Sequence, residues 1–238
     1  MLSQTLGYLC VRLYKHFSRG RLNRLITDKI ARLPAPHKQG RILNIGSGGS
    51  IYALVKSHLP AADLIQIDLD PKRNPDVVGD ACDMHMFSDA AFDLVLAFEV
   101  LEHIPTPQAA VNEIHRVLKP TGEFIGSVPF IFPIHDEPHD YFRFTTYGLA
   151  HLFRSFRSVA ITPRNDYLHS VLLLMARPLV IGNKWVRLAS VCIFLTAVLV
   201  YPLWWLLSLV FNNTLSTTGY FITAVPGPDT QSTNKENQ

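Results

Sequence analysis

Short runs of hydrophobic residues alternate with helical patterns from residue 41 onward. The short runs predict buried strands, and hydrophobic residues that recur every three or four positions predict the helices that cover them. We expect strands at residues 41–45, 64–68, 77–79, 92–98, 122–128, 159–162 and 218–225, and helices at residues 108–118 and 146–156. Strands that alternate with helices indicate an α/β fold, with a mostly parallel sheet and helices on both faces.

The first 33 residues have a different pattern, which predicts one or two amphipathic helices. Residues 1–41 contain nine lysines or arginines and a single acid, Asp28. These basic residues either form a solvated face packed on the domain or attach to anionic lipid headgroups. No long apolar region or cleavage site follows them, so a secretory signal is not expected. The hydrophobic positions of the pattern are Leu6, Leu9, Leu13 and Phe17, followed after Gly20 by Leu22, Leu25, Ile26 and Ile30.

Residues 168–211 interrupt the alternation with two hydrophobic segments. Residues 168–181 predict a short apolar helix, and residues 186–211 contain one charged residue, Arg187. About 20 apolar residues suffice to cross a bilayer, whereas a domain of this size seldom encloses a helix that is apolar all round. Charged residues make up only 17% of the chain, against about 25% in soluble domains. We therefore favour contact with a membrane over a buried core helix.

The spacing of the cysteines argues against a disulfide-linked or zinc-binding protein, and the placement of the basic residues argues against a nucleic-acid-binding one. Cys10, Cys82 and Cys192 are far apart and match neither a disulfide framework nor the spacing of a zinc site. We therefore expect a reducing, cytoplasmic setting. No nucleic-acid partner is expected, because the basic residues lie beside apolar helical positions and not in an aromatic-studded sheet.

The strongest chemical signal is the turn after the first strand, where residues 42–50 read Ile-Leu-Asn-Ile-Gly-Ser-Gly-Gly-Ser. Glycines let the backbone approach a ligand closely, and the helix that follows offers free N–H groups. Asp68 ends the next strand about 20 residues later, where an acid can accept hydrogen bonds from both hydroxyls of a ribose. The pair predicts an adenosine-containing cofactor at the carboxyl edge of the sheet, without separating NAD from S-adenosylmethionine (SAM).

Four further segments make the chain resemble class I SAM-dependent methyltransferases of the type 11 kind, over about residues 41–165. Their order and spacing are together highly specific. The rival enzyme, an NAD-dependent reductase, is disfavoured. The segments are Val78-Gly79-Asp80-Ala81, Phe92-Asp93-Leu94-Val95, Glu99-Val100-Leu101-Glu102-His103, and Glu113-Ile114-His115-Arg116-Val117-Leu118-Lys119-Pro120-Thr121-Gly122-Glu123.

The resemblance implies a Rossmann-like sheet of seven strands and SAM as cofactor. In the family, the acid at Asp80 approaches the adenine amino group, and the segment from Glu99 borders the methionine part of SAM and the substrate. The chain departs from the pattern at Asn44, where the family has an acid, and at Ser50, which replaces a third glycine. The cofactor-binding residues implied are Asn44, Gly46, Ser47, Gly48, Asp68, Asp80, Ala81 and Glu99.

Methyl transfer from SAM is an in-line displacement, so the protein mainly aligns the reactants and removes a proton from the acceptor. The segment at residues 129–145 follows the fifth strand and concentrates ionisable and aromatic side chains. We predict catalytic roles for His135 and His139, because histidine titrates near neutrality, and also for His103 and Asp140. An equally good interpretation of Asp140 is an ion pair with Arg143 that fixes the loop.

A metal site in this segment is not expected. His135, Asp136, Glu137, His139 and Asp140 are all possible ligands. However, Pro138 argues against a shared helix face for the two histidines. The acids would suit Mg²⁺, which the histidines would not.

The fold implied by the resemblance also restricts how the hydrophobic segments meet a membrane. Its last strand lies between the fifth and sixth, so both ends of the insertion are on one side and a single crossing is excluded. Arg177 is costly at the bilayer centre, and Pro202 offers a bend. We expect a hairpin that lies in one leaflet, with Trp204 and Trp205 at the interface and Lys184 and Arg187 near the headgroups.

The expected organisation has four parts. They are a basic amphipathic segment at 1–38, a methyltransferase domain at 39–167 and 214–226, a membrane-associated helical insertion at 168–213, and a disordered tail at 227–238. We expect a membrane-associated enzyme with a cytoplasmic catalytic domain, which methylates oxygen or carbon of a small, apolar or lipid-linked acceptor. The alternative is an inactive SAM-fold membrane scaffold or binding module.

Overall fold

The computed structural model describes residues 2–177, 184–210 and 216–227. The chain divides into two compact units. The larger comprises Ile26–Thr162 and Tyr220–Gln238, and the smaller comprises Met1–Leu25 and Pro163–Gly219. The predicted tail at 227–238 lies almost wholly outside the described residues, and the predicted domain boundaries stay predictions.

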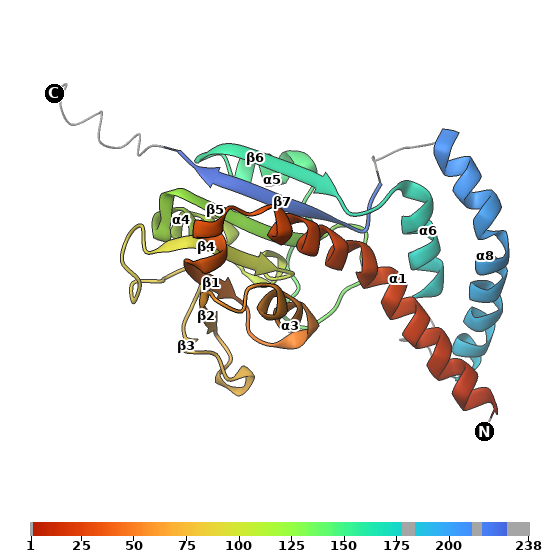
Figure 1. Cartoon of the computed structure of the whole chain (residues 1–238). Helices are drawn as coiled ribbons and strands as arrows, with labels where there is room; N and C mark the ends of the chain where they lie inside the picture. Colours follow the sequence, from red (N-terminus) through yellow and green to blue (C-terminus); the bar gives the residue numbers. More distant parts are fainter. Residues whose placement is uncertain (1, 178–183, 211–215, 228–238) are drawn as a thin grey trace. The chain divides into compact units, whose positions relative to one another are not determined.

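The larger unit is built on a sheet of seven strands in the order β3-β2-β1-β4-β5-β7-β6 (Figure 1). Parallel pairs join β1 to β2, β1 to β4, β2 to β3 and β4 to β5, and β7 runs opposite to β6. The strands predicted from hydrophobic runs are therefore confirmed, with shifts of a few residues at their ends. The strands are β1 (Arg41–Ile45), β2 (Asp63–Asp68), β3 (Val77–Val78), β4 (Phe92–Phe98), β5 (Leu118–Pro129), β6 (Phe156–Pro163) and β7 (Gly219–Pro226).

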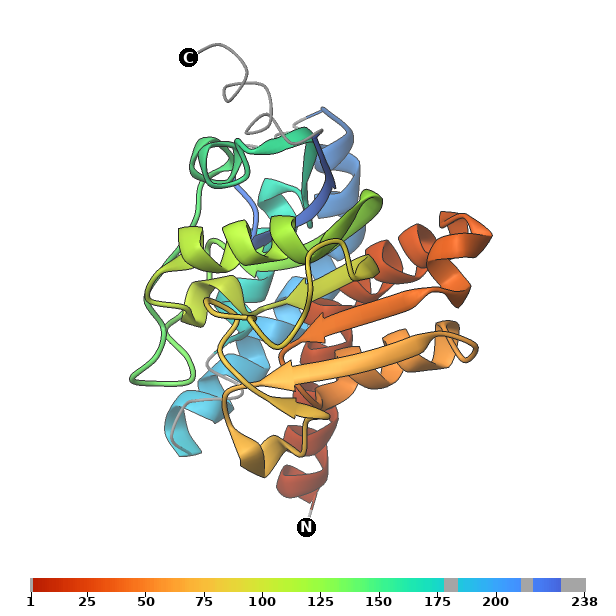
Figure 2. The same cartoon turned by 90° about the vertical axis from the view of Figure 1, so that its left-hand side faces the viewer.

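Helices lie in front of and behind the sheet, as Figure 2 shows. The α4 helix (Pro107–Val117) forms where the period of the hydrophobic residues predicts it, and it buries Ala110, Val111, Ile114 and Val117 on one side. The other short helices of this unit are α2 (Ala35–Gln39), α3 (Gly49–His58), η1 (Pro71–Arg73), η2 (Leu101–His103) and α5 (Thr146–Leu152).

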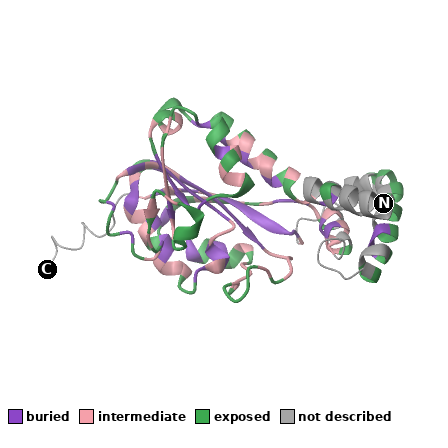
Figure 3. Cartoon of the chain, turned by 90° about the horizontal axis from the view of Figure 1, so that it is seen from below, coloured by how far each residue is buried: buried purple, intermediate pink, exposed green. Residues whose placement is uncertain are grey.

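The central strands form the core, and Figure 3 shows them buried between the helices. Phe92 and Leu94 of β4 are fully buried, as are Phe124 of β5 and Phe153. In the register of the sheet, Asn44 pairs with both Gln66 and Leu96. The carboxyl ends of β1, β2, β4 and β5 consequently meet at one edge, which is where ligands bind in sheets of this kind.

The first helix, α1 (Leu2–Arg32), is a single continuous helix and not two. It buries Leu22, Ile26 and Ile30, which are spaced four residues apart. The side chains of the four earlier predicted positions, Leu6, Leu9, Leu13 and Phe17, lie outside the described part of the chain.

The smaller unit contains α6 (Tyr167–Ala176) and α8 (Lys184–Val210), which pack against each other. Hydrogen bonds to Asn165, which precedes α6, join this segment to Thr217 and Thr218, which follow α8. Its Oδ1 accepts from Thr217 Oγ1 at 2.8 Å and from Thr218 N at 3.0 Å, and Asn165 is 3% exposed. The two ends of the inserted segment therefore lie together, as the predicted strand order required.

The α8 helix continues through Pro202, the residue that offered a bend, and whether it bends there stays a prediction. Its described side chains include large hydrophobic residues that are exposed, with Leu199 at 81% and Trp185 at 74%. Among residues 2–177, 184–210 and 216–227, no helix is long and apolar enough to cross a membrane. The side chains of Lys184, Arg187, Trp204 and Trp205 lie outside the described part.

Candidate active site

The turn between β1 and α3 leaves open space on its outer side. Gly46, Gly48 and Gly49 have φ angles of 87°, 77° and 76°, which residues with a Cβ rarely adopt. A Cβ on Gly46 would lie 2.8 Å from Val100 Cγ2, whereas nothing lies within 4 Å of a Cβ built on Gly48 or Gly49. The last two glycines therefore present bare backbone to whatever binds at this edge.

Side chains at the end of β2 hold the turn in place. Asp68 Oδ2 accepts from Ser47 N at 2.6 Å, and Gln66 Oε1 accepts from Ser47 Oγ at 3.0 Å. Asn44 Nδ2 donates to the carbonyl oxygen of Gly46 at 2.5 Å, which a carboxylate at this position could not do. Asp68 thus stands beside the turn as expected, while Gln66 is a supporting residue that the sequence did not single out.

Asp80 and Ala81 follow β3 at the same edge. Asp80 is exposed, and its Oδ1 accepts a hydrogen bond from Cys82 N at 2.8 Å, which closes a tight turn. Ala81 is buried. An exposed carboxylate on a fixed turn is able to accept from an adenine amino group, so the predicted role of Asp80 stays a prediction that the geometry permits.

Two loops after β4 and β5 are tied together at the carboxyl edge. The carbonyl oxygen of Glu102, in η2, accepts from Tyr141 N at 2.9 Å and from Phe142 N at 3.2 Å. In return, the carbonyl oxygen of His139 accepts from His103 Nδ1 at 2.7 Å. The loop predicted to supply acceptor-binding residues is thereby fixed to the turn after β4.

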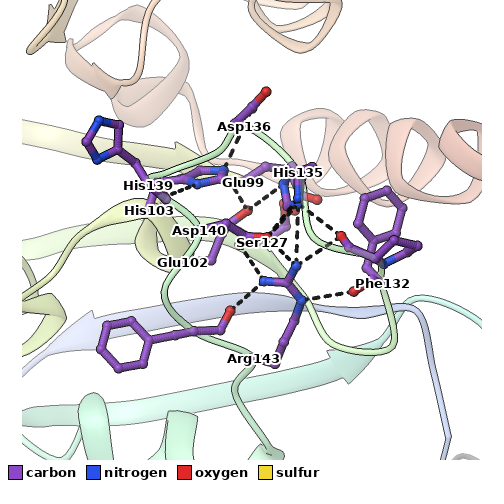
Figure 4. A network of polar contacts seen from close by, with 12 residues as sticks. Glu99, Glu102, His103, Ser127, Phe132, His135, Asp136, His139, Asp140 and Arg143 are labelled. Carbon is purple, nitrogen blue, oxygen red and sulfur yellow. Dashed lines mark hydrogen bonds and ion pairs between the residues drawn. The ribbon is translucent and has the colours of Figure 1, made fainter. Parts of the chain in front are cut away.

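The loop after β5 also has an internal clamp, formed by Asp140 and Arg143 (Figure 4). The two guanidinium nitrogens donate to the two carboxylate oxygens, each at 2.6 Å, and Arg143 also donates to the carbonyl oxygens of Phe132 and Pro133. The hydrogen bonds from Arg143 hold the pKa of Asp140 well below its usual range. This pairing favours the loop-fixing interpretation of Asp140 over a role as a base.

Glu102 is the centre of the cluster, and its side chain is fully buried. Its Oε1 lies 3.6 Å from His103 Nε2 and 3.9 Å from His135 Nε2. The two imidazole rings meet edge to face, with centroids 4.9 Å apart. Two imidazoles therefore face one buried carboxylate at the carboxyl edge of the sheet.

Glu99 lies at the end of β4, with a left-handed φ of 55°. Its Oε1 accepts from Ser127 Oγ at 2.8 Å, and its N–H donates to the carbonyl oxygen of Ser127 at 2.9 Å. These bonds join the ends of β4 and β5 where both strands run into the two loops. A left-handed conformation at a non-glycine residue is the kind of local strain that collects at functional sites.

Of the predicted catalytic residues, the structure brings together His103, His135 and Asp140. His139 is exposed, and its Nδ1 contacts Tyr141 Oη at 3.0 Å. Glu102 was not predicted as a site residue from the sequence, although it lies three positions after Glu99 in the same motif. Its burial, which marks it as central, depends on the loop that covers it.

Residues 43–126 match the family described as the methyltransferase domain. Comparison with curated proteins found no match. The match covers the glycine turn and the strands from β1 to most of β5.

Solved structures share the fold at low sequence identity. One is the Haemonchus contortus phosphoethanolamine N-methyltransferase 2, with 14% identity and a TM-score of 0.55 over 87% of this chain and 53% of that chain. A SAM-dependent methyltransferase from Archaeoglobus fulgidus has 15% identity and a TM-score of 0.54 over 89% of this chain and 98% of that one. The cyclase SpnF has 18% identity and a TM-score of 0.55, over 87% and 82%.

The family match over residues 43–126 and the shared fold support a class I SAM-dependent methyltransferase domain with SAM as its cofactor. The chain spans about half the length of the Haemonchus enzyme. The likeness to a cyclase illustrates that one fold hosts more than one reaction. The acceptor therefore has to be argued from the site.

Proposed function

We propose that the protein transfers a methyl group from SAM to an oxygen or carbon atom of an apolar or lipid-linked acceptor at a membrane surface. The observation that carries the transfer is the cluster of Glu102, His103 and His135 at the same sheet edge as the open glycine turn. Methyl transfer to such an acceptor needs the cofactor and a proton-removing group close together. The catalytic unit would be cytoplasmic.

The cofactor end of the proposal rests on the turn and on two carboxylates. SAM would lie along the bare backbone of Gly48 and Gly49, with its ribose at Asp68 and its adenine at Asp80. Asp68 already accepts from two backbone N–H groups, those of Ser47 and Asp70. A ribose would share these oxygens or replace one of the bonds, so we expect the turn to adjust when SAM binds.

The acceptor end rests on proton removal. A hydroxyl or carbon nucleophile attacks the methyl group faster when it loses its proton as the bond forms, which is typically worth 10² to 10⁴-fold. Both imidazoles use Nδ1 in contacts with loop oxygens, at 2.7 Å for His103 and 3.2 Å for His135. Their Nε2 atoms are left to interact with Glu102 and with the acceptor.

The membrane part of the proposal rests on α8 within the smaller unit. Exposed hydrophobic surface of this kind is typical of a binding face, and the exposed residues recur along the helix at spacings of three, four and seven. An apolar helix face and a basic segment together suit an anionic lipid surface. The exposed residues are Trp185, Val186, Ile193, Leu195, Leu199, Val200, Leu203 and Leu206.

Two measurements on the detergent-solubilised full chain test the proposal. Calorimetric titration with SAM is expected to give micromolar binding, and titration with NADH is expected to give none. Labelled SAM is then incubated with membrane lipid extract and with the aqueous extract, and label should enter the lipid fraction.

The scaffold alternative predicts a different outcome. If the folded chain does not bind SAM, the glycine turn is a structural relic and the methyl-transfer proposal fails. Label that enters only the aqueous fraction would contradict the apolar acceptor but leave the methyl transfer in place.

A further inference from the structure

The side chains of Glu102, His103 and His135 offer three ligand atoms that all lie within 4.8 Å of one another. The distances from Glu102 Oε1 are 3.6 Å to His103 Nε2 and 3.9 Å to His135 Nε2. Around a four-coordinate ion with bonds of about 2.1 Å, neighbouring ligand atoms lie about 3.4 Å apart. Shifts of a few tenths of an ångström would therefore bring the first two contacts to this spacing.

Both imidazoles are oriented as metal ligands usually are. A histidine that binds a metal generally donates its other ring N–H to a carboxylate or a backbone carbonyl group. His103 Nδ1 donates to the carbonyl oxygen of His139 at 2.7 Å, and His135 Nδ1 lies 3.2 Å from Asp140 Oδ2. The first contact fixes the tautomer of His103, whose Nε2 lone pair then faces Glu102. His135 Nδ1 also lies 3.3 Å from the carbonyl oxygen of Pro133 and 3.4 Å from Arg143 Nη2, and its Nε2 lies 3.9 Å from Glu102 Oε1.

The charges around the cluster also favour a cation. Glu102 is fully buried, and a buried carboxylate is costly unless positive charge compensates it. Arg143 pairs directly with Asp140 and also interacts electrostatically with Glu102 and Glu99, so one guanidinium serves several carboxylates. Glu99 and Asp136 add negative charge nearby, and Asp136 Oδ2 lies 3.9 Å from His103 Nε2.

We propose that Glu102, His103 and His135 form a site for one divalent transition-metal ion. Two imidazoles and one carboxylate suit Zn²⁺, Mn²⁺ or Fe²⁺ better than Mg²⁺ or Ca²⁺. Three protein ligands leave further positions for water or for an oxygen of the acceptor. The site differs from the ligand set considered from sequence, because Asp140 is held by Arg143 and Glu102 takes the central place.

The consequence for catalysis rests on the proposed function. An acceptor hydroxyl bound to such an ion would release its proton to solvent water more readily, since a metal lowers the pKa of a bound oxygen. With the ion bound, the cluster would act on the acceptor through the ion, and this would replace the direct proton removal by the imidazoles described under the proposed function. Metal binding itself needs neither SAM nor acceptor, so it is measured independently.

The test uses the full chain in detergent, stripped with a chelator and dialysed. Zn²⁺ is titrated by calorimetry and Co²⁺ by its visible absorption, with wild type, Glu102→Gln, His103→Ala and His135→Ala. His85→Ala is the matched control, because His85 forms an exposed pair with the carboxylate of Asp83. We expect one ion per chain, a loss of affinity of at least tenfold in each cluster variant, and no loss in the control.

Circular dichroism establishes that each variant is folded. His103 and His135 have side chains that are 20% exposed, so their alanine variants serve if the Glu102 variant fails to fold. Binding that is absent in wild type, or that is equal in wild type and the cluster variants, overturns the metal site. SAM binding is measured separately, in the presence of chelator. SAM binding without metal binding overturns only the metal site. Metal binding without SAM binding overturns only the proposed function.

Discussion

His103 Nδ1 donates a hydrogen bond of 2.7 Å to the carbonyl oxygen of His139, which lies 36 residues later in the chain. Because a carbonyl group can only accept, this bond places the proton of a neutral His103 on Nδ1. The Nε2 atom, 3.6 Å from Glu102 Oε1, then carries the lone pair. A loop contact thus decides which nitrogen of the imidazole is left for the proposed chemistry.

The first prediction concerns the lone pair of His103. Replacing His103→Ala removes it and should lower kcat about 10² to 10⁴-fold, while leaving the SAM dissociation constant unchanged. His103→Asn is the matched variant, because its amide can donate to the His139 carbonyl oxygen without supplying an imidazole. We expect it to be as stable as wild type and as inactive as the alanine variant. Retained turnover in His103→Asn would show that only the loop contact matters.

A second prediction concerns Asp140 and pH. Replacing Asp140→Asn should lower the free energy of unfolding by about 2 to 3 kcal/mol near neutral pH, because charged hydrogen bonds to Arg143 are lost. The pKa of Asp140 is lowered in the folded state, so its contribution is complete above the ordinary carboxyl pKa of about 4. It is lost as the pH falls through the lowered value.

The difference between wild type and Asp140→Asn is therefore expected to be constant from about pH 6 to 8 and to shrink below about pH 4. Urea unfolding followed at several pH values measures it. A difference that grows toward acid pH would contradict the ion-pair assignment.

The third prediction concerns the cofactor. Replacing Asp68→Ala should abolish measurable SAM binding, because it removes both the proposed ribose acceptor and the bond from Ser47 N that shapes the turn. Asp68→Asn retains one oxygen and should bind SAM at least tenfold more weakly than wild type. Isothermal titration measures both, and an unchanged affinity in Asp68→Ala would refute the ribose assignment.

A fourth prediction concerns the exposed face of α8. The double replacement Leu199→Glu and Leu203→Glu should lower binding to anionic lipid vesicles at least tenfold, because burying one such side chain contributes about 1.5 to 3 kcal/mol. Tyr147→Glu is the control, since Tyr147 is 87% exposed in the larger unit. Vesicle flotation compares the two, and equal loss in the control would point to a general effect of charge.

The fifth prediction concerns Asn165, which joins the two ends of the inserted segment. Replacing Asn165→Ala removes the acceptor of the buried N–H and hydroxyl groups of Thr218, and one of two acceptors of the Thr217 hydroxyl. It should cost about 1 to 3 kcal/mol of unfolding free energy. Thermal unfolding followed by circular dichroism measures it. A variant as stable as wild type would show that this buried cluster does not hold the ends together.

The sequence by itself determined the sheet and predicted the place of the cofactor. Strands such as Phe92–Phe98 are buried on both faces and read as continuous hydrophobic runs, so their positions follow from local pattern. The glycine turn and Asp68 could also be found from the sequence, because nucleoside-binding folds place a glycine-rich turn after one strand and an acid about 20 residues later. The order of the strands came from the resemblance that these motifs carry.

Only the tertiary structure decided which side chains meet. Glu102 and His135 are 33 positions apart, and nothing in the local pattern of either indicates that one carboxylate would face two imidazoles. The roles of Asp140 and His139 likewise separated only in three dimensions, because the backbone of one loop had to bond to the turn after another strand. Local sequence encodes periodicity and turn chemistry, whereas long-range packing determines burial, tautomer and charge pairing.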